Sequence, residues 1–132
     1  MSDVTAERVA RNEAAFRGSN EHLEARGKEL GFAADELTPF LCECADPGCT
    51  TLLRLTRTEY EAVRRSPVRF VYARGHERSS EGWGRVVDEF ERYTVVEKVG
   101  EAAEIAVALD EGEEVPDLIF PGDYEERFGG RR

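Results

Sequence analysis

The three cysteines of this chain lie within eight positions, and this cluster restricts the possible folds more than any other feature. Cys42, Cys44 and Cys49 follow a C-x-C-x4-C spacing in a protein of 132 residues. Asp46-Pro47-Gly48, between the last two, is typical of a tight turn, because proline sets φ and glycine accepts a positive φ. If the backbone at Cys42 and Cys44 is extended, their side chains share one side, and the turn can return Cys49 to it. The three sulfurs can therefore converge.

An odd number of cysteines excludes a complete disulfide framework, so the cluster indicates metal binding or thiol redox chemistry. A structural zinc site takes four Cys or His ligands. The chain has two histidines, His22 and His76. His22 falls in a predicted helix among polar residues, where a solvated side chain is typical, whereas His76 follows a strand end and Gly75, where the backbone can bend. The sequence thus predicts a zinc site made of Cys42, Cys44, Cys49 and His76.

Two other interpretations of the cysteines stay open. One is a cytosolic thiol-based redox sensor in which His76 or Arg54 activates a thiolate, and the other is a set of inert thiols. An iron–sulfur cluster ranks below zinc, because four thiolates are its usual ligands. A catalytic metal needs an open coordination position and a nearby acid or base, and Glu43 or Glu77 could serve only if one ligand were absent. No catalytic residue is assigned.

The charge of the chain bears on its partners. It has 28 acidic and 18 basic residues, a net charge of −10, which disfavours binding to nucleic acids or anionic membranes. Residues 54–78 are locally basic, with seven arginines against three glutamates. They could bind an anion or nucleic acid, although an ordinary surface of paired charges is the simpler interpretation. No run of about 20 apolar residues and no signal-peptide core is present, so we expect a cytoplasmic protein without a membrane span.

Residues 4–30 are predicted to form one long helix, with Asp3 or Thr5 as its N-cap. Apolar residues recur in it at an interval of seven: Val9, Phe16, Leu23 and Leu30. The simplest interpretation is a helix packed on its own domain. The alternative is a homodimer, or another partner complex, formed through this stripe.

The rest of the chain predicts a small α+β arrangement. The predicted elements are a strand at 51–55, a helix at 57–65, a strand at 68–72, a hairpin at 85–99 and a helix at 101–109. Thr56 and Glu59 have the spacing of a capping box. The hairpin region also fits the start of a helix, because its turn lacks Gly or Asn. Antiparallel pairing of the first two strands would bring His76 to Cys49.

The predicted fold class is α+β, a single domain over residues 1–109. A long first helix leads into a zinc-knuckle-like Cys/His unit at 40–77, followed by a small, mainly antiparallel sheet and a helix near 101–109. Residues 110–132 combine eight acidic residues with scattered large apolar ones. A composition of this kind is typical of a loosely ordered tail.

Several short motifs give the chain a likeness to a known group. They are Phe40-Leu41-Cys42-Glu43-Cys44 with Asp46 and Cys49, Glu59-Tyr60-Glu61, Gly75-His76-Glu77, Val95-Val96-Glu97-Lys98 and Gly100-Glu101-Ala102-Ala103. Over residues 8–109 the chain resembles a group of small actinobacterial proteins without an established activity. The resemblance implies a shared fold and a shared cysteine and histidine site, but no reaction. Arg74 and the acidic tail fall outside the pattern.

Together these features predict a non-enzymatic, zinc-binding regulatory or protein-interaction module with a structural Cys3His site. The second hypothesis is the redox sensor that uses the same cysteines. The third is a metal-dependent enzyme, or an anion or nucleic-acid binder acting through residues 54–78. The protein partner is not specified by the sequence.

Overall fold

The computed structural model describes residues 5–110. The helices and strands follow in the order α1 (Ala6–Glu29), β1 (Leu37–Leu41), β2 (Leu52–Thr56), α2 (Arg57–Arg64), β3 (Arg69–Tyr72), the 3-10 helix η1 (His76–Ser80), β4 (Gly84–Glu89), β5 (Thr94–Lys98) and α3 (Gly100–Asp110). This confirms the predicted α+β class. The predicted tail at 110–132 lies outside the described residues except for Asp110.

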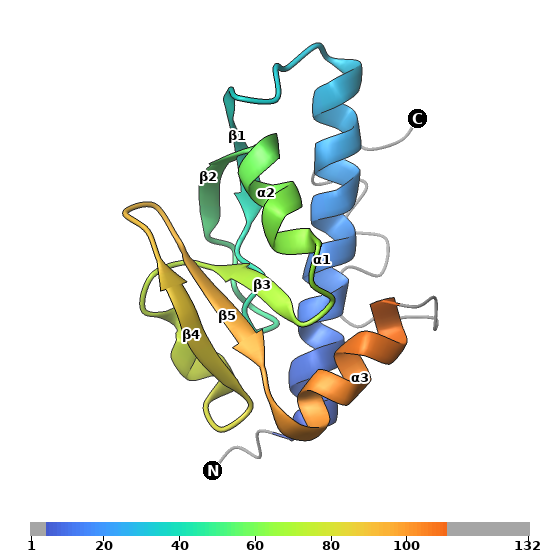
Figure 1. Cartoon of the computed structure of the whole chain (residues 1–132), viewed down its shortest axis with the longest axis vertical. Helices are drawn as coiled ribbons and strands as arrows, with labels where there is room; N and C mark the ends of the chain where they lie inside the picture. The colour runs from blue at the N-terminus through green and yellow to red at the C-terminus, as the bar shows by residue number, and fades with distance from the viewer. Residues whose placement is uncertain (1–4, 111–132) are drawn as a thin grey trace.

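The first helix, α1, runs along almost the full length of the molecule, with α3 against its N-terminal half (Figure 1). Thr5 is its N-cap, and the Thr5 hydroxyl accepts a hydrogen bond of 3.2 Å from the backbone of Arg8. Val9 and Phe16 are buried in the domain itself, whereas Leu30 is 57% exposed. Packing on its own domain is thus confirmed for the first half of the apolar stripe. The homodimer stays a prediction. Val9 and Phe16 are already buried within the single chain.

Two small antiparallel sheets form the β part. One pairs β1 with β2, and the other has the order β3-β5-β4. The antiparallel pairing of residues 51–55 with 68–72 that would bring His76 to Cys49 does not form, because β2 pairs with β1 and β3 pairs with β5. Strand β1 is not among the predicted strands, because Pro39 interrupts its pattern. Pro39 is tolerated because β1 is an edge strand, where a missing backbone N–H removes no ladder bond.

Local signals elsewhere in the sequence are confirmed. Helix α2 begins with the predicted capping box, in which Thr56 and Glu59 exchange side-chain to backbone hydrogen bonds of 2.9 and 3.0 Å. The β4–β5 hairpin forms at the predicted place. Its turn needs no glycine, because the backbone N–H of Phe90 donates to the carbonyl of Tyr93 at 2.8 Å and their rings lie 4.9 Å apart. Helix α3 matches the last predicted helix. None of the helices described over 5–110 is long and apolar enough to cross a membrane.

Polar side chains fix α1 to the sheets. Asn20 binds Leu41 of β1 as a neighbouring strand would: its amide donates to the Leu41 carbonyl at 2.9 Å and accepts from the Leu41 N–H at 2.7 Å. The Arg17 guanidinium donates to the carbonyls of Pro67 and Arg69 and lies 3.8 Å from the centre of the Phe70 ring. Helix α1 is therefore positioned by specific hydrogen bonds as well as by apolar packing.

Candidate metal centre

The structure brings together the four predicted ligands, Cys42, Cys44, Cys49 and His76, which we call the cysteine cluster. Cys42 directly follows β1, Cys44 and Cys49 lie in the β1–β2 connection, and His76 begins η1. Their donor atoms all lie within 4.8 Å of one another. The Nδ1 atom of His76 is 3.5 Å from the Cys42 sulfur and 3.6 Å from the Cys49 sulfur. His22 is not part of the group and lies on the exposed side of α1.

The gap between the cysteines and His76 is closed without pairing of β2 and β3. The backbone N–H of Glu43 donates to the Val71 carbonyl of β3 at 2.7 Å. Two residues further along, the N–H of Ala73 donates to the Cys42 sulfur at 3.1 Å. The chain that leaves β1 therefore runs beside β3, and His76, three residues beyond Ala73, reaches the sulfurs.

Backbone N–H groups act on the three sulfurs. The Cys42 sulfur accepts the N–H of Ala73 at 3.1 Å. The backbone of Asp46 favours a lower pKa for Cys44, and the backbone of Thr51 does so for Cys49. Backbone N–H groups favour the thiolate form, the form that binds metals.

The predicted turn at Asp46-Pro47-Gly48 forms in the structure. The Asp46 side chain accepts the N–H of Gly48 at 2.9 Å, and the Asp46 carbonyl accepts the N–H of Cys49 at 3.0 Å. An aspartate side chain that accepts the backbone N–H two residues later forms an Asx turn, which commonly stabilises tight turns. The sequence therefore predicted both the turn and the convergence that follows from it.

Two devices orient His76. Gly75 has φ of 89°, a left-handed conformation that glycine adopts readily, and this bend redirects the chain from β3 into η1. Ser79 then links η1 to the cysteine loop, because its hydroxyl donates to the His76 carbonyl at 2.9 Å and accepts the N–H of Ala45 at 2.9 Å. The backbone that carries the imidazole is consequently tied to the cysteine loop.

The spacing of the cluster suits a tetrahedral zinc ion. Zinc bonds of about 2.3 Å to sulfur and about 2.0 Å to nitrogen, at tetrahedral angles, place sulfur and nitrogen about 3.5 Å apart. The two sulfur–nitrogen separations of 3.5 and 3.6 Å match that edge. Three thiolates and one imidazole are also a ligand set that zinc prefers over magnesium or calcium.

Without a bound metal, the three thiols differ in pKa. A hydrogen bond from the Cys42 thiol lowers the pKa of Cys44 to about 5. The same hydrogen bond, together with burial, raises the pKa of Cys42, and burial raises the pKa of Cys49. Cys44 is thus the thiolate that its neighbours stabilise. A bound divalent cation would displace the remaining protons, as in other thiolate sites.

Glu43, one of the two acids considered as a catalytic base, is a structural residue. It is fully buried. Its carboxylate accepts hydrogen bonds from the Tyr60 hydroxyl at 2.7 Å, from the Asn20 amide at 2.9 Å and from the N–H of Val71 at 3.0 Å. With both oxygens used in this way, Glu43 fastens α1 and α2 to β3 and is not available to activate a water molecule.

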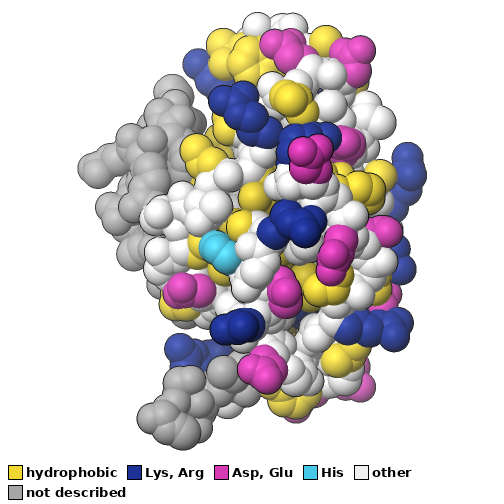
Figure 2. All heavy atoms as spheres, turned by 90° about the vertical axis from the view of Figure 1, so that its left-hand side faces the viewer, with side chains coloured by type: hydrophobic (Ala, Val, Ile, Leu, Met, Phe, Trp, Pro, Cys, Tyr) yellow, Lys and Arg dark blue, Asp and Glu magenta, His cyan; other side chains and the backbone are white. Residues whose placement is uncertain are grey.

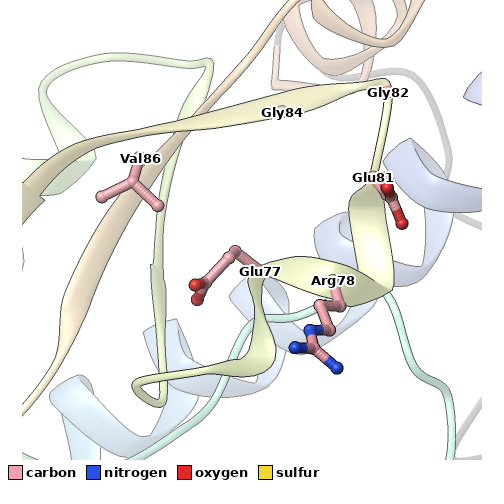
Figure 3. A pocket seen from close by; sticks show the side chains of 6 residues that line it. All are labelled: Glu77, Arg78, Glu81, Gly82, Gly84 and Val86. Atoms are coloured by element: carbon pink, nitrogen blue, oxygen red, sulfur yellow. The ribbon is translucent and has the colours of Figure 1, made fainter.

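Glu77, the other acid considered, faces a different part of the surface. It lines a shallow hollow between η1 and β4, and its carboxyl group points away from Arg78 (Figure 3). A separate hollow lies directly beside the cluster and is lined by Cys44, Asp46, His76, Arg78 and Ser79. Glu77 is not among the residues that line it. The cluster therefore opens to solvent next to Asp46 and Arg78, and not next to Glu77.

A second buried polar group, which the sequence did not indicate, lies on the far side of β3. Glu13 of α1 and Lys98 of β5 form an ion pair of 2.7 Å with both side chains fully buried. The Tyr72 hydroxyl donates to Glu13, and the Ser80 hydroxyl of η1 lies within hydrogen-bond distance of it, at 2.9 Å. Burial outweighs the attraction of Lys98 and raises the pKa of Glu13 to about 7. We call Glu13 and Lys98 the buried ion pair.

Gly84 of β4 lies over this ion pair. A Cβ atom there would come within 2.8 Å of the Lys98 ammonium, 2.9 Å of a Val96 methyl group and 3.0 Å of the Ser80 hydroxyl. Any side chain at residue 84 would therefore displace Lys98 or β5. The close approach explains a glycine inside a strand, which is otherwise unfavourable.

The arginines of residues 54–78 do not form a uniform basic surface. Arg64 pairs with Glu21 and Asp110, and Arg69 pairs with Glu97. On the side of the molecule that carries β4, basic and acidic side chains alternate (Figure 2). This arrangement favours the interpretation of ordinary paired surface charges.

No protein-family model, no curated protein and no solved structure matches the chain. The chemistry of the cysteine cluster is therefore the basis for assigning a function.

Proposed function

We propose that the protein is a zinc-binding module in which Cys42, Cys44, Cys49 and His76 hold one Zn²⁺ ion. The observation that carries the proposal is the convergence of four donor atoms within 4.8 Å, with sulfur–nitrogen separations that fit a zinc tetrahedron. The backbone donors to all three sulfurs support it, since they orient the ligands and stabilise thiolates.

The proposed role of the ion is structural and not catalytic. Four protein ligands complete a tetrahedral shell, whereas catalytic zinc sites keep one position for water or substrate. The carboxylate of Glu43 is fully used by three hydrogen bonds, and Glu77 faces another hollow. The ion would join the loop after β1 to the start of η1, and through them the two sheets. A module of this kind acts by presenting a surface to a protein partner.

The ligand assignment is tested with the two histidines. Full-length protein purified without a tag is expected to contain one equivalent of zinc by elemental analysis. His76→Ala should weaken zinc binding about 100-fold or more, because it removes one of four ligands from a site whose total binding free energy is on the order of 10 kcal/mol. His22→Ala is the matched control, since His22 lies on the exposed side of α1. Equal zinc retention in both variants would contradict the assignment.

Cobalt gives a second measurement of the same geometry. Co²⁺ bound by three thiolates and an imidazole in a tetrahedron shows intense visible bands and a sulfur charge-transfer band, which an octahedral oxygen site lacks. We expect these bands with the wild-type chain and with His22→Ala. Only weak, octahedral-type absorption in the wild-type chain would exclude the proposed site.

A further inference from the structure

The three thiolates of the cysteine cluster differ in solvent exposure and in hydrogen bonding. These differences favour the oxidation of two of them. Cys42 and Cys44 are buried, whereas Cys49 is partly exposed. The hollow lined by Cys44, Asp46 and His76 opens to solvent at the same place. A small oxidant can therefore reach Cys49 from the surface and Cys44 through the hollow.

Cys42 is bonded to the end of β3, whereas the backbone N–H of Cys49 is bonded within its own turn, to the Asp46 carbonyl. The backbone N–H of Cys42 donates to the Thr51 carbonyl at 3.0 Å, and its sulfur accepts the N–H of Ala73 from β3 at 3.1 Å. It directly follows β1, so moving it would disturb the pairing of both sheets. Cys44 and Cys49 flank the exposed turn 46–48, which can rearrange without breaking a strand.

A disulfide also joins Cys44 and Cys49 more easily than it joins Cys42 and Cys44. Their sulfurs already lie within 4.8 Å of each other, in one loop. A bridge between cysteines two residues apart closes a very small ring and is strained, whereas five residues with a turn between them allow ordinary disulfide geometry.

We propose that the cluster is a site of thiol oxidation by hydroperoxides, in which a Cys44–Cys49 disulfide forms and the metal leaves. This inference rests on the proposed zinc site. One thiolate attacks the O–O bond of hydrogen peroxide and becomes a sulfenic acid, releasing hydroxide. The second thiolate attacks that sulfur, forms the S–S bond and releases a second hydroxide. Two protons from solvent convert both hydroxides to water, and Zn²⁺, left with Cys42 and His76, dissociates.

The domain should stay folded after oxidation. The end of η1 keeps two hydrogen bonds of 2.9 Å, one between Ser79 and Ala45 and one between Ser80 and Tyr72. Both bonds are independent of the metal. The change is therefore confined to the turn 46–48 and His76, which lie beside the hollow.

The test uses the full-length, zinc-loaded chain and hydrogen peroxide. Released zinc is measured with a chromogenic chelator, and disulfides are located by mass spectrometry after the free thiols are alkylated. We expect one zinc released per disulfide formed, a loss of 2 Da in the peptide that contains the three cysteines, and alkylation at Cys42 only. A bridge that includes Cys42, or oxidation to sulfonic acid without a bridge, would overturn the proposal.

Two matched variants separate the bridge from the loss of a ligand. Cys42→Ser and Cys49→Ser each remove one ligand, but only the first keeps the proposed disulfide pair. Peroxide should remove 2 Da from Cys42→Ser and not from Cys49→Ser, and the opposite result would overturn the assignment. Wild-type protein that binds no zinc would refute the proposed function itself. Protein that binds zinc and retains it through peroxide treatment would refute only the oxidation site.

Discussion

The cysteine cluster and the buried ion pair lie on either side of β3, and both join segments that are distant in the chain. The cluster joins residues 42 and 76, and the ion pair joins residues 13 and 98. The cluster depends on an ion from solution, whereas Glu13 and Lys98 neutralise each other. One Glu13 oxygen has no hydrogen-bond partner among the described residues. The supply of metal in solution therefore controls the cluster but not the ion pair.

Removal of the metal should produce the largest effect on stability. A ligand present at about 1,000 times its Kd adds about 4 kcal/mol to the free energy of unfolding. For a domain of this size, that change corresponds to about 15 °C in Tm. Thermal unfolding of the reduced protein with zinc and with a chelator measures the difference. The chelator should lower the Tm of His76→Ala less than that of the wild type, because the variant binds zinc more weakly. An unchanged wild-type Tm would mean that the cluster stabilises nothing.

Loss of one member of the buried ion pair should have the next effect on the free energy of unfolding. Lys98→Ala leaves the Glu13 carboxylate buried without its cation, which typically costs about 3 to 5 kcal/mol. Urea unfolding measures the change in the free energy of unfolding. Zinc content should stay at one equivalent in the folded variant, because Lys98 donates to no residue of the cluster. A loss below about 1 kcal/mol would show that Glu13 is solvated in the native protein.

The pH dependence of the ion pair is a third test. The pKa of Glu13 is raised by burial from 4.5 to about 7. A raised folded-state pKa gives stability that is fully present below the unfolded pKa and is lost as the pH rises through the folded pKa. Glu13→Gln cannot titrate, so it should be more destabilising at pH 5 than at pH 8, by up to about 3 kcal/mol. Urea unfolding at both pH values tests this, and a constant difference would contradict it.

Replacement of the whole ion pair should have the smallest effect. Glu13→Leu combined with Lys98→Met keeps the volume and removes both buried charges. Such replacements are often neutral or stabilising, so we expect the double variant to lie within about 1 kcal/mol of the wild type or above it. The matched change in the cluster, with all four ligands replaced by apolar residues, should abolish zinc binding. A double variant less stable than Lys98→Ala would show that the ion pair is required.

The two regions also differ in how far the sequence predicts them. Cysteine and histidine are rare in this chain, and their chemistry is restricted, so the spacing and the turn were enough to predict all four members of the cluster. Glutamate is common in this chain, and Glu13 on a helix has the appearance of a solvated charge. No local pattern relates it to a lysine 85 positions later. Only the tertiary structure brings the two together.

The same limit explains the errors in the predicted fold. The capping box, the hairpin and the helices depend on neighbouring residues and were predicted correctly. Strand β1 was missed because Pro39 obscures its alternation, and without β1 the true partner of β2 could not be identified. Asn20 contributes nothing to the apolar stripe of α1, although it binds Leu41 across the helix–strand contact. A long-range hydrogen bond of this kind leaves no periodic signal.

The bond between Asn20 and Leu41 has a further consequence for self-association. An edge strand with unpaired N–H and C=O groups is a template for another chain, and long edges favour aggregation. In β1 the Asn20 side chain occupies both backbone groups of Leu41, and Pro39 presents no N–H at all. Helix α1 thus closes the outer edge of β1 with a single amide, and the small β1–β2 sheet is protected against growth by strand addition on that side.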